Sequence, residues 1–244
     1  MSEAPARVHG SVAPAVSWDA FQTMDGVFAI VGEELRSHKG RSVVAVSLNG
    51  RRCFLKRFCF VSSRPYKRNV ARGLHELHMI DWLNSHGFAG PKVVRRGTGG
   101  SFLLKTRLFF LMEEVPGESP LEEAWRNNPG EIDSLSTALA SFAASLHDSG
   151  FVHTDFSERH ILVGGGASGW TFRLMDLERA SVGPFREGRA AADLATLAAS
   201  VADHRLREKI NSDFLDAYIA RRRTLASGLD FRKLFAVASP TKSF

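Results

Sequence analysis

The dipeptide Asn49-Gly50 separates two apolar, strand-like runs, "SVVAVSL" before it and "RRCFLKRF" after it. A two-residue hairpin turn needs positive φ at both central residues, and Asn and Gly adopt positive φ most readily. The pattern therefore predicts an antiparallel β-hairpin. The segment "VFAIV" at 27–31 has the same strand-like character, so we expect strands of an antiparallel sheet from Val27 to about Phe60.

A helix is predicted next, in "PYKRNVARGLHELHMIDWLNSHG" at 65–87, where apolar residues recur at helical spacing and Gly87 stops the run. The apolar positions are Val70, Leu74, Leu77, Ile80 (or Met79) and Leu83. Two further strands are predicted at "PKVVRRG" (91–97) and "LFFLMEEV" (108–115). The second strand runs into Pro116-Gly117, which breaks regular structure as a hinge does.

The remaining chain has mainly helical periodicity. Ser119 and Pro120 are predicted to begin a short helix as its N-cap and first residue. A longer helix is predicted from Ile132 to Asp148, and "GGGASG" is predicted to join two short strands at 160–163 and 171–177.

Three regions are expected from this organisation. Residues 1–17 have no periodicity and are predicted to form a flexible tail. Residues 18–115 would form a strand-rich N-lobe and residues 116–244 a helix-rich C-lobe.

Composition narrows the class of protein. With 44% apolar and 24% charged residues, the chain is expected to fold except at its ends. No apolar run approaches the roughly 20 residues that span a bilayer, and the N-terminus lacks the apolar segment of a signal peptide, so a cytoplasmic location is expected. Cys53 and Cys59 are badly spaced for a disulfide and too few for structural zinc, so we interpret them as packing residues.

Four polar residues stand in an order that suits phosphoryl transfer, which needs a cation for the nucleotide phosphates, a carboxylate for the attacking hydroxyl and ligands for magnesium. Lys56 is predicted at the end of a strand, and Glu76 lies on the following helix, where it could pair with Lys56. Asp155 lies in a loop after a long helix, and Asp176 follows a short apolar strand. We interpret Asp155 as the residue that orients the acceptor and Asp176 as a magnesium ligand.

Each of these residues also has an ordinary structural interpretation. Lys56 could be a solvated edge lysine, and Glu76 could lie on the wet face of its helix. Asp155 could be an N-cap beside a turn histidine, His153, and Asp176 could cap a turn. Zinc binding by the polar loop is disfavoured, because too few ligands are available there at a suitable spacing.

Five segments together resemble the protein-kinase-like fold: "FLK", the helix with Glu76, "LMEEVPG", "LHDSGFVHTDFSERHILV" and "RLMDLERA". The resemblance is greatest to the lipopolysaccharide kinase family (InaA-type, lipopolysaccharide core heptose kinase) and extends from Glu33 to about Tyr218. It implies an α+β, two-lobed fold with an antiparallel-sheet N-lobe that contains one helix, and a mainly helical C-lobe.

The departures from protein kinases favour this branch of the fold. Protein kinases have His-Arg-Asp with Asn five residues after the Asp, whereas here the loop reads His153-Thr154-Asp155 with His160 at that position. The Asp-Phe-Gly motif is replaced by "DLERA" from Asp176, and no Gly-x-Gly-x-x-Gly loop precedes Lys56. Only 16 residues separate Asp176 from Asp193, which leaves little room for a peptide-docking segment and favours a small-molecule or glycan acceptor.

By resemblance, the protein is expected to be an ATP-dependent phosphotransferase that phosphorylates a sugar, a heptose, of the lipopolysaccharide inner core. ATP would lie between the lobes, with its adenine on the backbone from Glu113 to Val115 and its phosphates on Lys56, which Glu76 holds. Mg²⁺ would bind Asp176. Because imidazole suits softer metals, three roles stay open for His160: it is a weak second ligand, only one metal is held firmly, or it hydrogen-bonds a phosphate oxygen. Asp193 would brace the catalytic loop.

The excess of basic over acidic residues fits an acceptor that is part of lipopolysaccharide. The net charge of +6 and clusters such as "RRCFLKR", "RPYKR", "KVVRR" and "RRR" are expected to favour peripheral binding to the anionic inner membrane. No motif supports nucleic-acid binding. The alternatives are a related kinase of the same fold, acting on Kdo, an antibiotic or a simple sugar, and a non-catalytic nucleotide-binding pseudokinase.

Overall fold

The computed structural model describes residues 13–38, 40–61, 64–101, 105–166, 169–222 and 228–238. These residues form two compact units. The first contains the described residues up to His78 together with Pro91–Pro116, and the second contains Met79–Gly90 and the described residues from Gly117 onward. Within the described part of the chain, no helix has the length and hydrophobicity needed to cross a bilayer.

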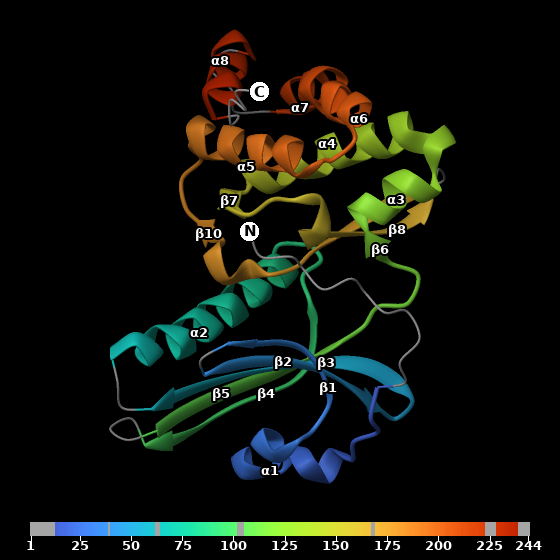
Figure 1. Ribbon diagram of the computed structural model, residues 1–244. Coiled ribbons are helices and arrows are strands. Elements are labelled where there is room, and N and C mark those ends of the chain that lie inside the picture. Colours follow the sequence, from blue (N-terminus) through green and yellow to red (C-terminus); the bar gives the residue numbers. More distant parts are fainter. Residues whose placement is uncertain are drawn as a thin grey trace. The chain divides into compact units, whose positions relative to one another are not determined.

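A five-stranded antiparallel sheet is the centre of the first unit (Figure 1). Its order is β1-β2-β3-β5-β4. The strands are β1 (Glu33–His38), β2 (Arg41–Leu48), β3 (Arg51–Val61), β4 (Lys92–Ser101) and β5 (Lys105–Glu113). The predicted hairpin is confirmed, because Leu48 pairs with Arg51 and both turn residues have positive φ, 51° at Asn49 and 75° at Gly50.

The segment "VFAIV" is not a strand, and that prediction was wrong. Helix α1 (Met24–Ala29) covers most of it, because the Thr23 side chain accepts a hydrogen bond from the Gly26 N–H at 3.0 Å and caps the helix N-terminus. The guanidinium of Arg57 donates to the Ile30 carbonyl just beyond the helix, at 2.9 Å. The first strand is β1 instead.

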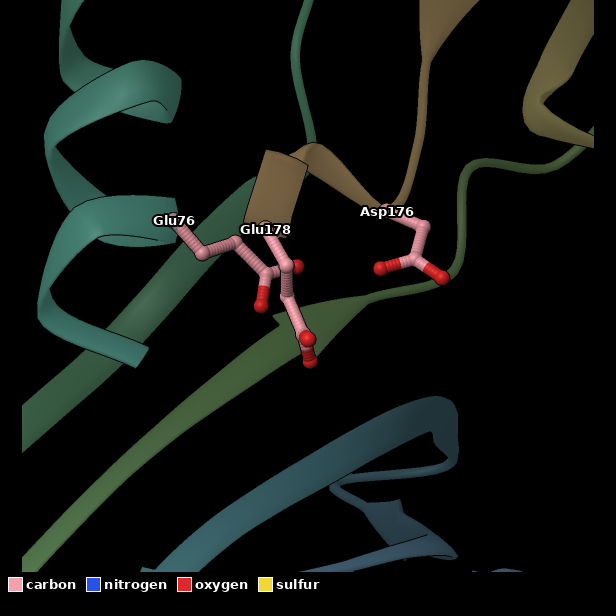
Figure 2. A group of neighbouring side chains, drawn as sticks. All are labelled: Glu76, Asp176 and Glu178. Atoms are coloured by element: carbon pink, nitrogen blue, oxygen red, sulfur yellow. The ribbon is translucent and has the colours of Figure 1, made fainter. Parts of the chain in front are cut away.

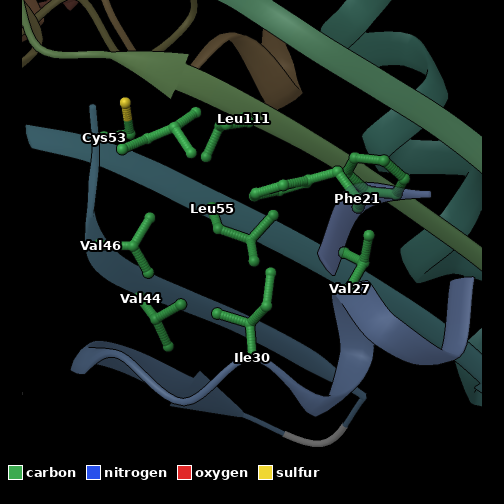
Figure 3. Packing of buried hydrophobic residues seen from close by; sticks show 10 residues of the cluster. Phe21, Val27, Ile30, Val44, Val46, Cys53, Leu55 and Leu111 are labelled. Carbon is green, nitrogen blue, oxygen red and sulfur yellow. The ribbon is translucent and has the colours of Figure 1, made fainter. Parts of the chain in front are cut away.

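The apolar core of the first unit lies between α1 and one face of the sheet (Figure 3). Alternate residues of neighbouring strands point to this face, as the two-residue period of a strand requires. The sheet residues are Val44, Val46, Leu48, Cys53, Leu55, Phe109 and Leu111. Cys53 is buried there as a free thiol, as predicted.

Part of the predicted N-terminal tail is hydrogen-bonded to the sheet. The Val16 N–H donates to the Ser47 carbonyl and the Ser47 N–H donates to the Pro14 carbonyl, both at 2.8 Å. Residues 1–12 of that predicted tail lie outside the described part of the chain.

Helix α2 (Arg64–Ser85) packs against the other face of the sheet at Gly73. A Cβ atom at Gly73 would lie 2.5 Å from a methyl carbon of Leu108 and 2.9 Å from the ring of Phe58, so only glycine fits this close approach. The apolar positions predicted for this helix are buried, except Leu74, whose exposure is 48%.

The second unit is mainly helical, as expected. Its helices include α3 (Leu121–Asn127), α4 (Ile132–Asp148), α5 (Glu187–Ser200), α6 (His204–Lys209), α7 (Leu215–Arg221) and α8 (Gly228–Ala238). Helix α4 has the predicted limits. Short strands are β6 (Ser119–Pro120), β7 (Phe151–Val152), β8 (Ile161–Gly166), β9 (Gly169–Leu174) and β10 (Ser181–Val182), of which β8 and β9 are the two predicted strands.

Ser119 does not cap α3, which corrects the sequence prediction. Ser119 pairs with Val163 as part of β6, and Pro120 is the N-cap of α3. Strand pairing therefore delays the start of the helix by one residue.

The chain passes from the first unit to the second at Pro116-Gly117, where Gly117 has a φ of 80°.

Candidate active site

Lys56 and Glu76 form a buried ion pair in the first unit. The Lys56 Nζ lies 2.9 and 2.7 Å from the two carboxylate oxygens of Glu76, and the residues are 8% and 1% exposed. Lys56 is in the middle of β3, paired with Val43 and Phe110, and not at a strand end as predicted. The solvated-edge interpretation of Lys56 is therefore wrong, and Glu76 does not lie on a wet face.

A small basic cavity of about 50 Å³ adjoins Lys56. Its lining residues are Arg36, His38, Arg41, Ser42, Val43 and Lys56. The β1–β2 turn beside it contains Gly40, with a φ of 77°, whose carbonyl accepts a hydrogen bond from the Cys59 N–H at 2.7 Å. Lys39 of this turn lies outside the described residues. The sequence did not point to Arg36 and His38, because β1 has few apolar residues and was not recognised as a strand.

Glu113, where the sequence predicts adenine contact, is the last residue of β5. Its carboxylate pairs with Lys92 Nζ at 2.5 Å and with Arg51. Hydrogen bonds from Lys92 and then Arg51 hold the pKa of Glu113 below its usual value. The backbone of Glu113 is part of the sheet, where it pairs with Cys53 of β3 and Lys92 of β4. The half-buried Val115 follows two residues later.

Asp193 on α5 holds the predicted catalytic loop of the second unit. Its buried carboxylate accepts hydrogen bonds from the backbone N–H groups of His153 and Thr154, both at 2.7 Å. The ring of His147 lies 3.4 Å from the same carboxylate and 2.8 Å from the hydroxyl of Tyr218. The bracing contact that the resemblance implies for Asp193 is therefore present.

His153 supports this loop as a neutral side chain. Its Nε2–H donates to the Met175 carbonyl at 2.9 Å, and its Nδ1 accepts from the Asp155 N–H at 3.3 Å. Burial lowers the pKa of His153, which favours the uncharged ring. Both nitrogens are occupied, so His153 is not available as a metal ligand. The interpretation of Asp155 as an N-cap is wrong, because Ser157 is the N-cap of the next turn.

His160 lies beside both predicted catalytic carboxylates. Its Nδ1 is 3.0 Å from the Asp155 carbonyl and 3.6 Å from an Asp155 carboxylate oxygen, and its Nε2 is 3.9 Å from an Asp176 carboxylate oxygen. A carbonyl can only accept, so we assign the proton to Nδ1. Nε2 is the ring nitrogen that lies toward Asp176. The second unit thus brings together Asp155, His160 and Asp176.

Asp176 and Glu178 present two carboxylates from one short segment after β9 (Figure 2). Asp176 has a φ of 54° and precedes a 3-10 turn, η4 (Leu177–Arg179), without making a capping hydrogen bond. Figure 2 also shows Glu76 on α2. Carboxylate oxygens are suitable magnesium ligands, so both residues of this segment fit the predicted metal. Glu178 was not predicted as a site residue, although it stands two residues after Asp176.

Glu158 is a further acidic residue next to the loop. It is 7% exposed, and its carboxyl group has no hydrogen-bond partner among the described residues. Burial, with a smaller contribution from Glu122, raises the pKa of Glu158 to about 7. No pattern in the sequence indicates this burial.

A Glu158→Gln variant is expected to gain stability over the wild type as pH rises. The raised pKa means that the folded state binds the proton of this carboxyl group more tightly than the unfolded state does. The wild type therefore keeps its full stability below the unfolded pKa and loses stability as pH rises toward about 7. Gln does not ionise, so, with solvent screening of the charge taken into account, the difference in the free energy of unfolding should be about 1 kcal/mol larger at pH 8 than at pH 5.5. Urea unfolding at the two pH values measures it, and an equal difference at both would contradict the prediction.

Comparison with known proteins agrees with this geometry. The model of the lipopolysaccharide kinase (Kdo/WaaP) family matches residues 28–218. A solved structure described as "WaaP in complex with acyl carrier protein" is similar, with a TM-score of 0.64 and 22% identity over 88% of each chain. Among curated proteins, none matches the sequence. The structural likeness confirms the predicted protein-kinase-like α+β fold, and the family match covers most of the chain, which therefore belongs to the lipopolysaccharide kinase (Kdo/WaaP) family.

Proposed function

We propose that the protein transfers the γ-phosphoryl group of ATP to a hydroxyl of a lipopolysaccharide inner-core sugar, with a heptose as acceptor. The observation that carries this proposal is the braced loop of the second unit. Asp193 fixes the backbone of that loop, which places the Asp155 carboxylate beside His160 and in the same small region as Asp176.

In the proposed reaction, the oxygen of the sugar hydroxyl forms a bond to the γ-phosphorus. The bond between that phosphorus and the oxygen bridging to the β-phosphate breaks, and ADP leaves. Asp155 orients the hydroxyl and accepts its proton. Because the transition state of phosphoryl transfer is loose, correct positioning contributes more than basicity, and a fixed backbone at Asp155 supplies it.

The first unit is proposed to bind the nucleotide. Lys56 would neutralise its phosphates, and Arg36 and Arg41 of the basic cavity would take the place of a glycine-rich loop. The backbone from Glu113 to Val115 would hydrogen-bond the adenine. Magnesium, when bound, neutralises charge on the phosphate oxygens; Asp176 and Glu178 would hold it, with His160 Nε2 as a weaker donor.

Replacing His160 with asparagine tests its part in metal binding. An amide offers magnesium a hard oxygen where imidazole offers a nitrogen. We expect the magnesium concentration for half-maximal activity to fall about tenfold, the size of effect usual for changes next to a metal. Activity titrations with MgCl₂ measure it, with His160→Ala as the control that lacks any donor. An unchanged magnesium dependence in both variants would remove His160 from the metal site.

Transfer of labelled phosphate from ATP to purified core oligosaccharide tests the function itself. The expected product carries one added phosphate on a heptose, which fragmentation in a mass spectrometer distinguishes from phosphate on Kdo. Absence of transfer to any core sugar, with nucleotide binding intact, would refute the proposal.

Peripheral binding to an anionic membrane is proposed as well, because the acceptor of this family is lipid-linked and the chain carries a net charge of +6. Two members of the cluster "RRCFLKR" do not serve this purpose. Lys56 is buried, and Arg57 donates to backbone carbonyls. Arg95 and Arg96 on β4 are exposed. If vesicles with anionic lipid fail to sediment the protein in a salt-sensitive way, this part of the proposal is wrong.

A further inference from the structure

The second unit contains a cavity of about 450 Å³ that the proposed chemistry does not use. It lies among α3, the 3-10 turn η3 (Glu158–His160), the residues after α5, and α6. Its volume is within the range of sites that bind small molecules. Its charged lining residues are Glu122, Arg126, Glu158, Asp203, Arg205 and Lys209.

One buried polar group at this cavity lacks a partner. It is the indole N–H of Trp125; Trp125 is 4% exposed, and this nitrogen has no hydrogen-bond partner among the described residues. The carboxyl group of Glu158 also lines the cavity, and the backbone N–H of that residue donates to Ser200 Oγ at 3.1 Å. Buried polar groups are nearly always hydrogen-bonded, so the unpaired donor, with a carboxyl group at the same cavity, points to a polar ligand.

The charges of the lining restrict the class of that ligand. Three acidic and three basic side chains give a formal sum of zero, which does not favour a phosphate or another anion. Trp125, Ile132, Val201 and Leu206 add apolar surface to this lining, so the cavity offers hydrogen-bonding groups and apolar contacts together. A polyhydroxylated ligand both donates and accepts hydrogen bonds, so it suits carboxylates, guanidinium groups and an indole N–H together. The largely apolar ring of Trp125 can pack against the C–H surface of a sugar.

The position of the cavity relative to Asp155 suggests which sugar binds there. Glu158 follows Asp155 by three residues, so their Cα atoms are at most about 11 Å apart. The turn between them is fixed, because the His160 N–H donates to the Ser157 carbonyl at 2.9 Å and His160 Nδ1 contacts the Asp155 carbonyl. A sugar next to the one at Asp155 is therefore within reach of Glu158.

We propose that this cavity binds the acceptor sugar adjacent to the one that is phosphorylated, through Glu158, Trp125 and Arg126. The inference rests on the proposed function and adds to it a recognition site for an oligosaccharide, as distinct from a single sugar. Glu158 and Trp125 are positioning residues for this binding, because neither touches the transferred phosphoryl group.

The test fills the cavity from its rim. Ala202 lines the cavity and is exposed, so Ala202→Trp adds bulk there without disturbing the core; Ala220→Trp on α7, also exposed, is the matched control outside the cavity. The ratio of kcat/KM for core oligosaccharide to kcat/KM for free heptose is expected to fall at least tenfold in Ala202→Trp and to stay constant in Ala220→Trp. An unchanged ratio in Ala202→Trp, or equal losses for both acceptors, would overturn the proposal.

A second pair of variants examines the buried carboxyl. Glu158→Gln retains a hydrogen-bonding group and should keep the ratio within about threefold, whereas Glu158→Leu should lower it tenfold through KM for the oligosaccharide. Equal ratios in the two variants would count against recognition by Glu158.

The proposed function and this inference can be tested by separate measurements. If the wild type transfers phosphate to no sugar, calorimetric titration with core oligosaccharide still decides the inference: binding that Ala202→Trp weakens at least tenfold supports it, and no binding, or equal binding by both proteins, overturns it. Binding of a fatty acid that Ala202→Trp abolishes, with the sugar ratio unchanged, would assign the cavity to an acyl ligand and refute the proposal.

Discussion

Asp155→Ala is expected to lower kcat for transfer to core oligosaccharide about 1,000-fold, a typical loss for a residue that handles the reacting proton. The side chain of Asp155 is the group that the braced loop positions, whereas the backbone hydrogen bonds of the loop go to Asp193. The substitution therefore removes the acceptor-orienting carboxylate and leaves the loop in place. Single-turnover transfer of labelled phosphate measures the loss.

Asp155→Asn provides the matched control. It keeps the size of the side chain and its ability to accept a hydrogen bond but removes the negative charge. The Kd for ADP and the unfolding midpoint should match the wild type in both variants. Activity of Asp155→Ala within tenfold of the wild type would exclude Asp155 as the residue that orients the acceptor.

Lys56→Met is expected to abolish detectable transfer and to lower the free energy of unfolding by about 3–5 kcal/mol, the usual cost of leaving one member of a buried pair without its partner. Glu76 is only 1% exposed, so water cannot replace the lost ammonium. Urea unfolding gives the free energy, and fluorescence titration with a nucleotide analogue gives binding.

The double variant Lys56→Met/Glu76→Leu separates stability from function. Both charges are gone, so most of the lost stability should return, because apolar replacement of a whole buried pair is often neutral. Transfer should remain absent, because the ammonium group proposed to neutralise the phosphates is gone. Recovery of transfer in the double variant would show that Lys56 has only a structural role.

The parts of the fold that the sequence predicts correctly are those with strong local signals. Asn49-Gly50 specifies its turn through the φ values of two residues. The helix at 132–148 follows from apolar periodicity, and the structure gives the same limits. Neither prediction depends on distant contacts.

The errors occur where tertiary contacts decide. The segment at 27–31 is apolar enough for a strand, but the cap at Thr23 and the hydrogen bonds of Arg57 favour a helix. Strand β1 exists because β2 pairs with it, although its own residues are mostly polar and exposed. Ser119 has the chemistry of an N-cap and is used in strand pairing.

The candidate site was predictable only through the order of its motifs. Lys56, Glu76, Asp155 and Asp176 each had a plausible structural role alone, and their order along the chain together with the resemblance joined them into one hypothesis. Burial is a property of the packed molecule, so the same reasoning could not find Glu158 or Trp125. Their roles, like those of the motif residues, stay predictions until the variants are measured.

The close packing at Gly73 makes the candidate site sensitive to a mutation at a residue that carries no charge. Helix α2 approaches the sheet at this residue, and Glu76 lies one turn further along the same side of the helix. A single added methyl group would push against the fully buried Phe58 and Leu108, and the helix would have to move away and carry Glu76 from Lys56. A position with no side chain thus sets the spacing on which an ion pair depends, and natural variants of this protein should be as intolerant there as at the charged residues themselves.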